Sequence, residues 1–298
     1  MSFSTTVKTE LCRVPMLRPC CTRAEAYGAL LYASVFSHRE IRLSTENAAV
    51  ARRVQALLSR AFGVDAQPQQ VGRKKQLALT EESQIGLIFD ALGYDRKNHV
   101  TYHLNRNVLE NDCCIPAFLR GVFLMAGTVA GPEKKSHLEI TSAHPSLCGE
   151  TMSLMLDERL SPKQTVRRGA HVLYFKDAPS VEDFLTLTGA PRAAMELMEA
   201  KVEKNLRNTI NRQVNCETAN LVKATDAAAR QIAAIQSVLD KHGEGAFPEN
   251  LRETVRLRLS YPTDSLAELA TRFVPPISKP GLSHRLKKIT ELASREDT

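Results

Sequence analysis

The chain has 298 residues, a formal net charge of +7 and 43% hydrophobic residues, which is typical of a globular protein with two or three domains. The positive charge favours a polyanionic partner, whereas the lack of Trp and only 5% aromatic residues argue against a stacking platform for single-stranded nucleic acid. The sequence holds no apolar run of about 18 residues, no secretory signal and no CxxC pair among its seven cysteines, so we expect a cytoplasmic protein without a membrane span.

The first predicted helix opens with Cys20-Cys21, and a similar helix opens with Cys113-Cys114, after an offset of 93 residues. The same offset superimposes Gly28 on Gly121. A glycine inside a helix costs about 1 kcal/mol relative to alanine, and close packing of two backbones commonly offsets that cost. We therefore expect the two helices to touch through these glycines at the centre of a pseudo-twofold unit.

The two cysteine pairs leave two interpretations open. Four thiolates across a pseudo-twofold axis can hold zinc. Neighbouring residues at the start of a helix point about 100° apart, however, which makes it awkward for both members of a pair to reach one ion. We therefore favour the interpretation in which the cysteines are small buried apolar residues, with no metal and no cofactor.

The likeness between the two segments continues beyond the opening helices. In each copy a strand-like run leads to an amphipathic helix, then to two strand-like runs around a basic turn, and finally to a short helix. We expect each copy to follow the order αββαββα, and two copies predict an α+β fold in which antiparallel strands form a saddle. The basic turns are candidate secondary DNA contacts, and their residues are Arg73, Lys74, Lys75, Arg167 and Arg168.

The spacing from Gly28 to Ser34, and from Gly121 to Gly127, resembles the motif of LAGLIDADG homing endonucleases. The resemblance implies that the two motif helices pack at the subunit junction. It also implies an acid, just before the last small residue, that binds the catalytic divalent metal. Ala33 and Ala126 occupy those positions, and a methyl group cannot ligate a hard cation. We therefore expect no catalytic residue and no enzymatic activity.

The middle of the chain, from about 193 to 241, has a helical pattern with apolar residues at i, i+4 spacing, beginning with Met198 and Val202. Between two such stripes lies a polar stretch rich in asparagine, which is a poor residue for the interior of a helix. We expect a solvated linker with a break near Cys216-Glu217. The alternative is contact with phosphates or base edges, for which the candidate residues are Arg207, Asn211, Arg212 and Asn215.

The C-terminal stretch predicts three short helices. Ser265 and Glu268 form a capping box for the second helix, and the third buries an apolar face from Leu282 to Ala293. Two crossing helices of which the second is amphipathic and basic are typical of a helix-turn-helix, whose second helix enters the major groove of DNA. The candidate DNA-binding residues on this helix are Lys279, Ser283, His284, Arg285, Lys287 and Lys288.

Four stretches of the chain, in the right order, resemble the WhiA family of bacterial regulators. They are STENAAVARR (44–53), FLRGVFLMAGTV (118–129), NRQVNCETANLVKATDAAARQI (211–232) and PPISKPGLSHRLKKI (275–289). The resemblance implies a degenerate LAGLIDADG domain joined to a C-terminal helix-turn-helix. It also implies a role in transcription control, cell division, chromosome segregation and, in spore formers, sporulation.

These observations predict two pseudo-symmetric LAGLIDADG-like repeats (1–105 and 106–192), a long helical linker (193–245) and an all-α helix-turn-helix domain (246–298). The predicted function is that of a nucleoid-associated regulator that binds double-stranded DNA and takes no small-molecule substrate. One alternative is an adaptor that binds the transcription machinery, such as RNA polymerase or a sigma factor. The other alternative is an active homing-type endonuclease.

Overall fold

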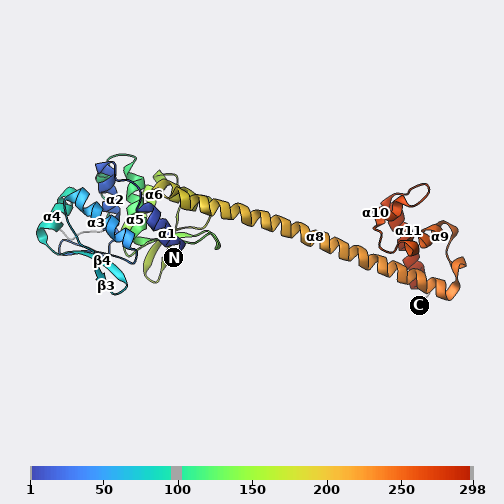
Figure 1. Ribbon diagram of the computed structural model, residues 1–298. Helices are drawn as coiled ribbons and strands as arrows, with labels where there is room; N and C mark the ends of the chain where they lie inside the picture. Colours follow the sequence, from blue (N-terminus) through green and yellow to red (C-terminus); the bar gives the residue numbers. More distant parts are fainter. Residues whose placement is uncertain (1, 95–102, 296–298) are drawn as a thin grey trace. The chain divides into compact units, whose positions relative to one another are not determined.

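The computed structural model describes residues 2–94 and 103–295. The chain forms two compact units, an N-terminal unit of residues 1–204 and a C-terminal unit of residues 205–298 (Figure 1). The stretch of the first predicted repeat from 95 to 102 lies outside the described residues.

The N-terminal unit contains the predicted order αββαββα twice, which confirms the α+β class. After an additional first helix, α1 (Phe3–Leu11), the first copy comprises α2 (Pro19–Leu31), β1 (Val35–Phe36), β2 (Ile41–Thr45), α3 (Ala48–Phe62), β3 (Gln69–Val71), β4 (Lys74–Leu79) and α4 (Glu82–Ala91). The second copy comprises α5 (Cys114–Ala126), β5 (Gly127–Val129), β6 (Leu138–Ser142), α6 (Pro145–Asp157), β7 (Lys163–Arg167), β8 (Ala170–Phe175) and α7 (Ala178–Thr188).

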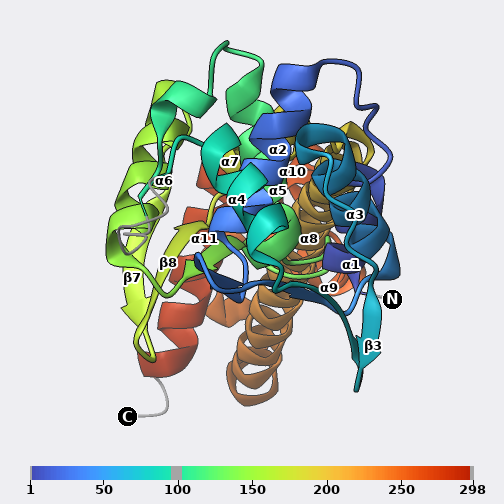
Figure 2. The ribbon, with the colours of Figure 1, turned by 90° about the vertical axis from the view of Figure 1, so that its left-hand side faces the viewer.

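Each copy supplies one antiparallel sheet, with strand orders β1-β2-β4-β3 and β5-β6-β8-β7. The alternation along β2 buries Ile41 and Leu43, because successive side chains of a strand point to opposite faces of its sheet. Figure 2 shows β3 and β7 on opposite sides of the unit, with α2 and α5 between them. The two sheets thus occupy equivalent places on either side of the paired helices.

Helix α1 was not anticipated from the sequence. The Ser2 hydroxyl accepts a hydrogen bond from the backbone N–H of Thr5 at 3.3 Å, and Val7 and Leu11 are fully buried. The spacing Phe3, Val7, Leu11 behind a serine cap was the available signal. The helix contacts α3, α5 and β5, so it covers part of the surface around the end of α5.

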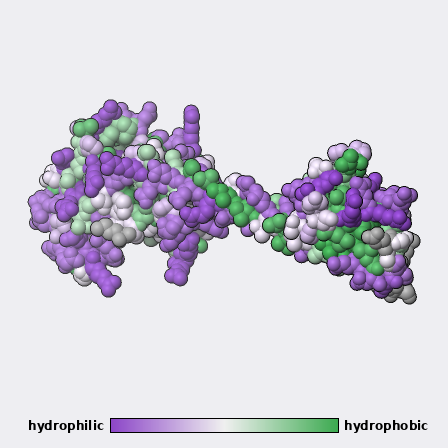
Figure 3. All heavy atoms as spheres, turned by 45° about the vertical axis from the view of Figure 1, so that its right-hand side comes forward, coloured by the Kyte–Doolittle hydropathy of each residue, from purple (hydrophilic) through white to green (hydrophobic). Residues whose placement is uncertain are grey.

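Helix α8 (Pro191–His242) is continuous over 52 residues, so the predicted break near Cys216-Glu217 is wrong. Polar side chains in this stretch bond along the helix: the Gln213 amide, for example, donates to the Glu217 carboxylate at 2.9 Å. The apolar side chains that begin with Met198 and Val202 are exposed, and Figure 3 shows hydrophobic residues at the surface of this helix.

The C-terminal unit packs the last turns of α8 against three helices, α9 (Glu249–Ser260), α10 (Leu266–Thr271) and α11 (Lys279–Arg295). Ile235 and Val238 of α8 are buried in the same core as Leu282 and Leu286 of α11. The C-terminal end of α8 therefore packs as a fourth helix of this domain.

The predicted capping box of α10 is present, and α11 is capped as well. Ser265 and Glu268 form the capping box of α10. The Ser278 hydroxyl accepts a hydrogen bond from the N–H of Gly281 at 3.2 Å at the start of α11. Both caps satisfy N–H groups that have no partner within their own helix.

Candidate nucleic-acid interface

The two opening helices, α2 and α5, cross through their glycines as the sequence predicts. A methyl group on Gly28 would overlap the carbonyl oxygen of Phe118, and one on Gly121 would overlap the carbonyl oxygen of Glu25. Phe118 and Glu25 are themselves 93 residues apart, so the contact has the pseudo-twofold symmetry of the repeat. Glycine is required here because the two backbones leave no space for a Cβ atom.

Ala33 follows the end of α2, and Ala126 is the last residue of α5. Both side chains are partly buried against the hydrophobic core. The two positions where the LAGLIDADG resemblance implies metal-binding acids thus present methyl groups to their surroundings.

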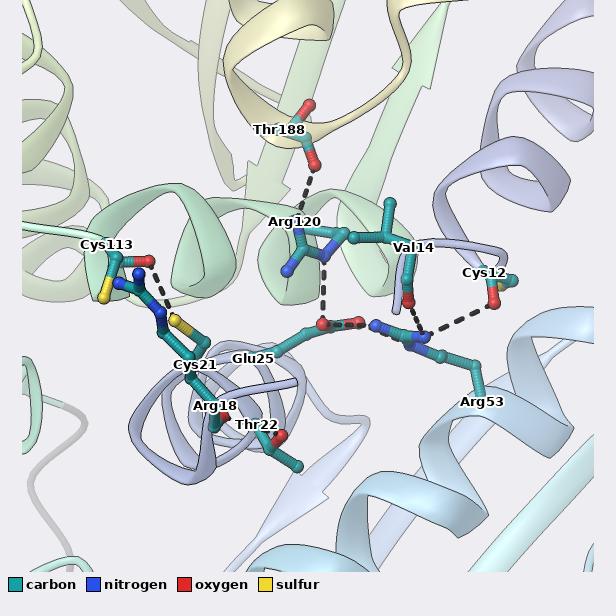
Figure 4. A network of polar contacts seen from close by, with 10 residues as sticks. All are labelled: Cys12, Val14, Arg18, Cys21, Thr22, Glu25, Arg53, Cys113, Arg120 and Thr188. Carbon is teal, nitrogen blue, oxygen red and sulfur yellow. Dashed lines mark hydrogen bonds and ion pairs between the residues drawn. The ribbon is translucent and has the colours of Figure 1, made fainter. Parts of the chain in front are cut away.

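A buried ion network lies beside the glycine crossing (Figure 4). The Glu25 carboxylate of α2 accepts two hydrogen bonds from Arg53 of α3, at 2.8 and 2.7 Å, and one from Arg120 of α5, at 2.9 Å. The three side chains are only 1%, 6% and 9% exposed. One buried carboxylate thus joins three helices from both repeats.

The surplus positive charge of this network is directed at backbone carbonyls. Arg120 donates to the carbonyl oxygen of Thr188 at 2.8 Å, and Arg53 donates to the carbonyl oxygens of Cys12 and Val14. Sequence reasoning missed this network, because its partners are 28 and 95 residues apart. The only available signal was a charged residue, Glu25, on the apolar face of the opening helix.

The four cysteines at the starts of α2 and α5 converge. The Sγ atoms of Cys20, Cys21, Cys113 and Cys114 all lie within 4.8 Å of one another. Both members of each pair thus approach one centre, although the angle between neighbouring residues at a helix start makes that awkward. Rotation about χ1 moves each Sγ enough to compensate for the angle between neighbouring Cβ atoms. Cys114 is buried in the hydrophobic core, and Cys20, Cys21 and Cys113 are partly buried against it, so the cysteines also have the apolar surroundings that the sequence suggests.

The thiols of this cluster are in different electrostatic environments. Burial raises the pKa of Cys21 to about 12 and that of Cys114 to about 11. A hydrogen bond from the Arg18 guanidinium lowers the pKa of Cys113. Arg18 therefore supplies a positive charge beside the cluster, as Figure 4 shows for Cys21 and Cys113.

The two basic turns of the N-terminal unit lie at the tips of hairpins. Arg73 and Lys74 are exposed and Lys75 is half-buried, whereas Arg167 and Arg168 are both exposed. Arg167 contacts the Glu139 carboxylate at 3.2 Å. The second tip therefore presents less net positive charge than the first.

The candidate residues of α8 are all exposed on its central turns, and they are Arg207, Asn211, Arg212 and Asn215. These residues belong to the C-terminal unit. The structure thus leaves these amide and guanidinium groups accessible, as both interpretations of this stretch require.

Helix α11 presents a basic face to the outside of the C-terminal unit. Leu282, Leu286 and Ile289 are buried, whereas the opposite side carries the exposed residues His284 and Lys288. This separation follows from the helical period of 3.6 residues. A nucleic-acid duplex can therefore approach the polar face without disturbing the core.

The remaining α11 candidates lie at the borders of this face. Ser283 and Lys287 line a groove against α8 together with Arg230, and Lys279 lines a second hollow near Asp264. The Lys287 ammonium is 3.7 Å from the Glu291 carboxylate, but both side chains are largely exposed and the pair is weak.

The guanidinium of Arg285, the last α11 candidate, lies 5.5 Å from the centre of the Phe273 ring. This half-buried side chain joins α11 to the turn before it. The structure thus places six predicted residues on one helix but divides them among four surroundings.

Comparison with known proteins adds sequence relationships to this geometry. A family profile described as WhiA C-terminal HTH domain matches residues 210–293, and one described as WhiA LAGLIDADG-like domain matches residues 115–207. A protein of Ruminiclostridium cellulolyticum named Probable cell division protein WhiA is 37% identical over 307 residues, covering 99% of this chain and 98% of its own length. The chain belongs to the WhiA family.

A second WhiA relative, from Alkaliphilus metalliredigens and with the same name, is 37% identical over 313 residues, which cover 99% of this chain and 98% of that protein. The fold is similar to the crystal structure of full-length DUF199/WhiA from Thermatoga maritima, with a TM-score of 0.61 and 24% identity over 99% of both chains. The predicted WhiA membership and its two-part architecture are thus confirmed.

The WhiA helix-turn-helix match begins at residue 210, inside α8. The C-terminal part of α8 therefore belongs to the family's helix-turn-helix region, consistent with the burial of Ile235 and Val238 in the core of that unit. Within the described ranges, none of the helices has the length and hydropathy needed to span a bilayer.

Proposed function

We propose that this WhiA family member is a DNA-binding transcription regulator that acts in cell division and chromosome segregation and, in spore formers, in sporulation. The observation that carries the proposal is the exposed basic face of α11, which stands opposite a buried apolar face in a helix-turn-helix domain. Lysines supply attraction to phosphates, and His284 supplies a group that reads base edges. The names of the curated relatives support the link to cell division.

The proposal includes the absence of DNA cleavage. Ala33 and Ala126 offer no oxygen ligand for a divalent metal, and α1 contacts β5, which begins directly after Ala126. The scaffold then serves to hold and orient DNA or protein. Incubation with plasmid and genomic DNA in magnesium is expected to leave both intact, and discrete cuts that disappear on chelation would revive the nuclease alternative.

The domain limits proposed for this function are 1–105, 106–192, 193–245 and 246–298, and the last turns of the third segment pack into the core of the fourth. In this arrangement the helix-turn-helix selects the DNA sequence, and the hairpin tips with Arg73 and Arg168 add contacts that do not depend on sequence. Such a protein associates with the nucleoid.

DNA binding is tested with the full chain and a duplex that the full chain itself selects from a random pool. The logarithm of the affinity should fall linearly with the logarithm of salt concentration, with a slope of about −0.9 for each phosphate neutralised. Binding that does not change between low and high salt would contradict the proposal.

Two α11 variants separate base readout from phosphate contact. His284→Ala should weaken binding to the selected duplex by about 1–3 kcal/mol, and it should change binding to random DNA little. Lys287→Ala should weaken both alike and reduce the salt slope by about one phosphate. Arg256→Ala removes one exposed charge from α9 and serves as the matched control. Equal effects of all three variants on the affinity for both duplexes would contradict the assignment of α11 as the helix that contacts DNA.

A protein adaptor is the second candidate function, and the exposed apolar side chains of α8 favour it. Met198, Val202 and Leu206 are 41%, 68% and 60% exposed. In this alternative α8 binds RNA polymerase or a sigma factor. Purified polymerase should then retain the nuclease-treated chain, and Leu206→Glu should abolish retention without changing DNA affinity. Retention that depends on DNA would exclude the adaptor.

A further inference from the structure

The four-cysteine cluster at the junction of the two repeats has no place in the DNA-binding proposal. Cys20 and Cys21 belong to the first turn of α2, whereas Cys113 is the N-cap of α5 and Cys114 its first residue. Four of the seven cysteines are thus gathered at one point from two segments 93 residues apart. None of them forms a disulfide.

We propose that Cys20, Cys21, Cys113 and Cys114 form a structural site for one zinc ion, which joins the two repeats at the start of their central helices. The ligand set is four thiolates without an open position. Such a closed site stabilises a fold and does not activate a substrate.

The distances fit a single tetrahedral ion. Zinc–sulfur bonds of about 2.3 Å place the sulfur atoms of a tetrahedron about 3.8 Å apart. The Sγ atoms of Cys20 and Cys113 are 4.0 Å apart, and no pair in the cluster exceeds 4.8 Å. Four atoms within that limit all lie about 3 Å or less from a common point, which is close to the length of a zinc–sulfur bond.

Two other uses of the same thiols fit the geometry less well. A disulfide requires the two sulfur atoms to be about 2.0 Å apart, whereas the Sγ atoms of Cys20 and Cys113 are 4.0 Å apart, and none of the four thiols is oxidised. An iron–sulfur cluster contains several iron and sulfide atoms, so its cysteine ligands must stand farther apart than these. The compact grouping therefore favours one thiophilic ion.

Positive groups at this point offset part of the cost of placing thiolates in a partly buried site. Both cysteine pairs lie at helix N-termini, where backbone N–H groups and the helix dipole stabilise anions. The Arg18 side chain lies beside Cys21 and Cys113 (Figure 4). Arg23 of α2 forms an ion pair at 3.1 Å with Glu110, in the segment just before α5. The helix starts are thus held together by contacts on either side of the thiols.

The zinc ion would form a second link between α2 and α5, in addition to their contact at the glycines. Gly28 and Gly121 bring the middles of α2 and α5 into contact, and the ion would lock their N-terminal ends. Binding should therefore slow amide hydrogen exchange in the first turns of both helices, because those turns open together only when the ion leaves.

The test begins with the untagged full chain, purified under anaerobic and reducing conditions. Elemental analysis should find one zinc ion per chain. The variant Cys20→Ser/Cys113→Ser, which removes one thiol from each repeat, should lose the ion. Cys216→Ser removes an exposed cysteine of α8 and should keep it.

A second measurement uses the wild-type chain, so its result does not depend on whether a variant folds. Zinc is removed from the wild-type chain, and Co²⁺ is added in its place. Four thiolates in a tetrahedral arrangement should produce intense visible bands that saturate at one cobalt per chain and disappear when zinc is added back. Exchange in the first turns of α2 and α5 should slow at the same stoichiometry.

Several results would overturn the site. A fully reduced wild-type chain that takes up neither zinc nor cobalt would do so, as would zinc retained by the double variant. Iron with acid-labile sulfide, or a Cys20–Cys113 disulfide in place of metal, would replace the mononuclear site by another chemistry. DNA affinity is not a readout in this experiment, so its outcome is independent of the proposed function.

Discussion

Replacing Glu25 by alanine is expected to destabilise the junction of the two repeats strongly. The carboxylate accepts three hydrogen bonds from two arginines, at 2.7 to 2.9 Å, and is 1% exposed. Without it, Arg53 and Arg120 remain buried without a counter-charge. Breaking one buried ion pair by removing a partner costs about 3–5 kcal/mol, and the shared carboxylate places this substitution at the upper end of that range.

The substitution Glu110→Ala is the matched control. Glu110, like Glu25, forms an ion pair with an arginine, in this case Arg23 of α2 at 3.1 Å. The Glu110 and Arg23 side chains, however, are 50% and 39% exposed. Solvent screens such a pair, and its loss should cost less than about 1 kcal/mol. The comparison therefore isolates burial as the cause, because each substitution removes a carboxylate from an arginine partner.

Amide hydrogen exchange of the full chain, read on peptides from α2 and α5, measures the effect locally. A loss of about 3 kcal/mol or more corresponds to exchange at least about 100-fold faster, since each 1.4 kcal/mol is a factor of ten. Peptides from the C-terminal unit should not change. Equal acceleration by Glu25→Ala and Glu110→Ala would refute the reasoning that the buried carboxylate holds the junction.

Three further predictions concern individual residues. Gly121→Ala should destabilise the N-terminal unit by about 1–3 kcal/mol, because its methyl group meets the backbone of α2, whereas Gly149→Ala, with open space around it, should not; equal thermal unfolding of the two variants would contradict the tight crossing. Burial lowers the pKa of Lys8 from 10.5 to about 8, so between these pH values Lys8 is neutral in the folded state and still protonated in the unfolded state. The free energy of unfolding of the wild type, relative to that of Lys8→Met, should therefore rise from pH 8 to 10.5. Denaturant titrations that show a constant difference between the two proteins would contradict this prediction. Ser265→Ala should cost the C-terminal unit about 1 kcal/mol by removing the cap of α10, and calorimetry that shows no change in its transition would count against that role.

Much of the local architecture was predictable because it depends on short-range interactions. The apolar period of α3, the capping box at Ser265 and the buried stripe of α11 each involve residues a few positions apart. The glycine seam was predictable for another reason: the repeat itself marks Gly28 and Gly121 as equivalent. A short-range pattern is also present for α1, where Val7 and Leu11 are buried behind the Ser2 cap.

The amino-acid sequence by itself thus determined the two repeats, the glycine crossing, the missing metal-binding acids and the amphipathic basic helix at the C-terminus. Only the tertiary structure decided that Glu25 meets Arg53 and Arg120, that four thiols converge and that α8 runs without a break. The reason is physical. Periodicity and caps record interactions between neighbours in the chain, whereas a buried ion pair or a cluster of sulfur atoms exists only once packing has brought distant segments to the same place.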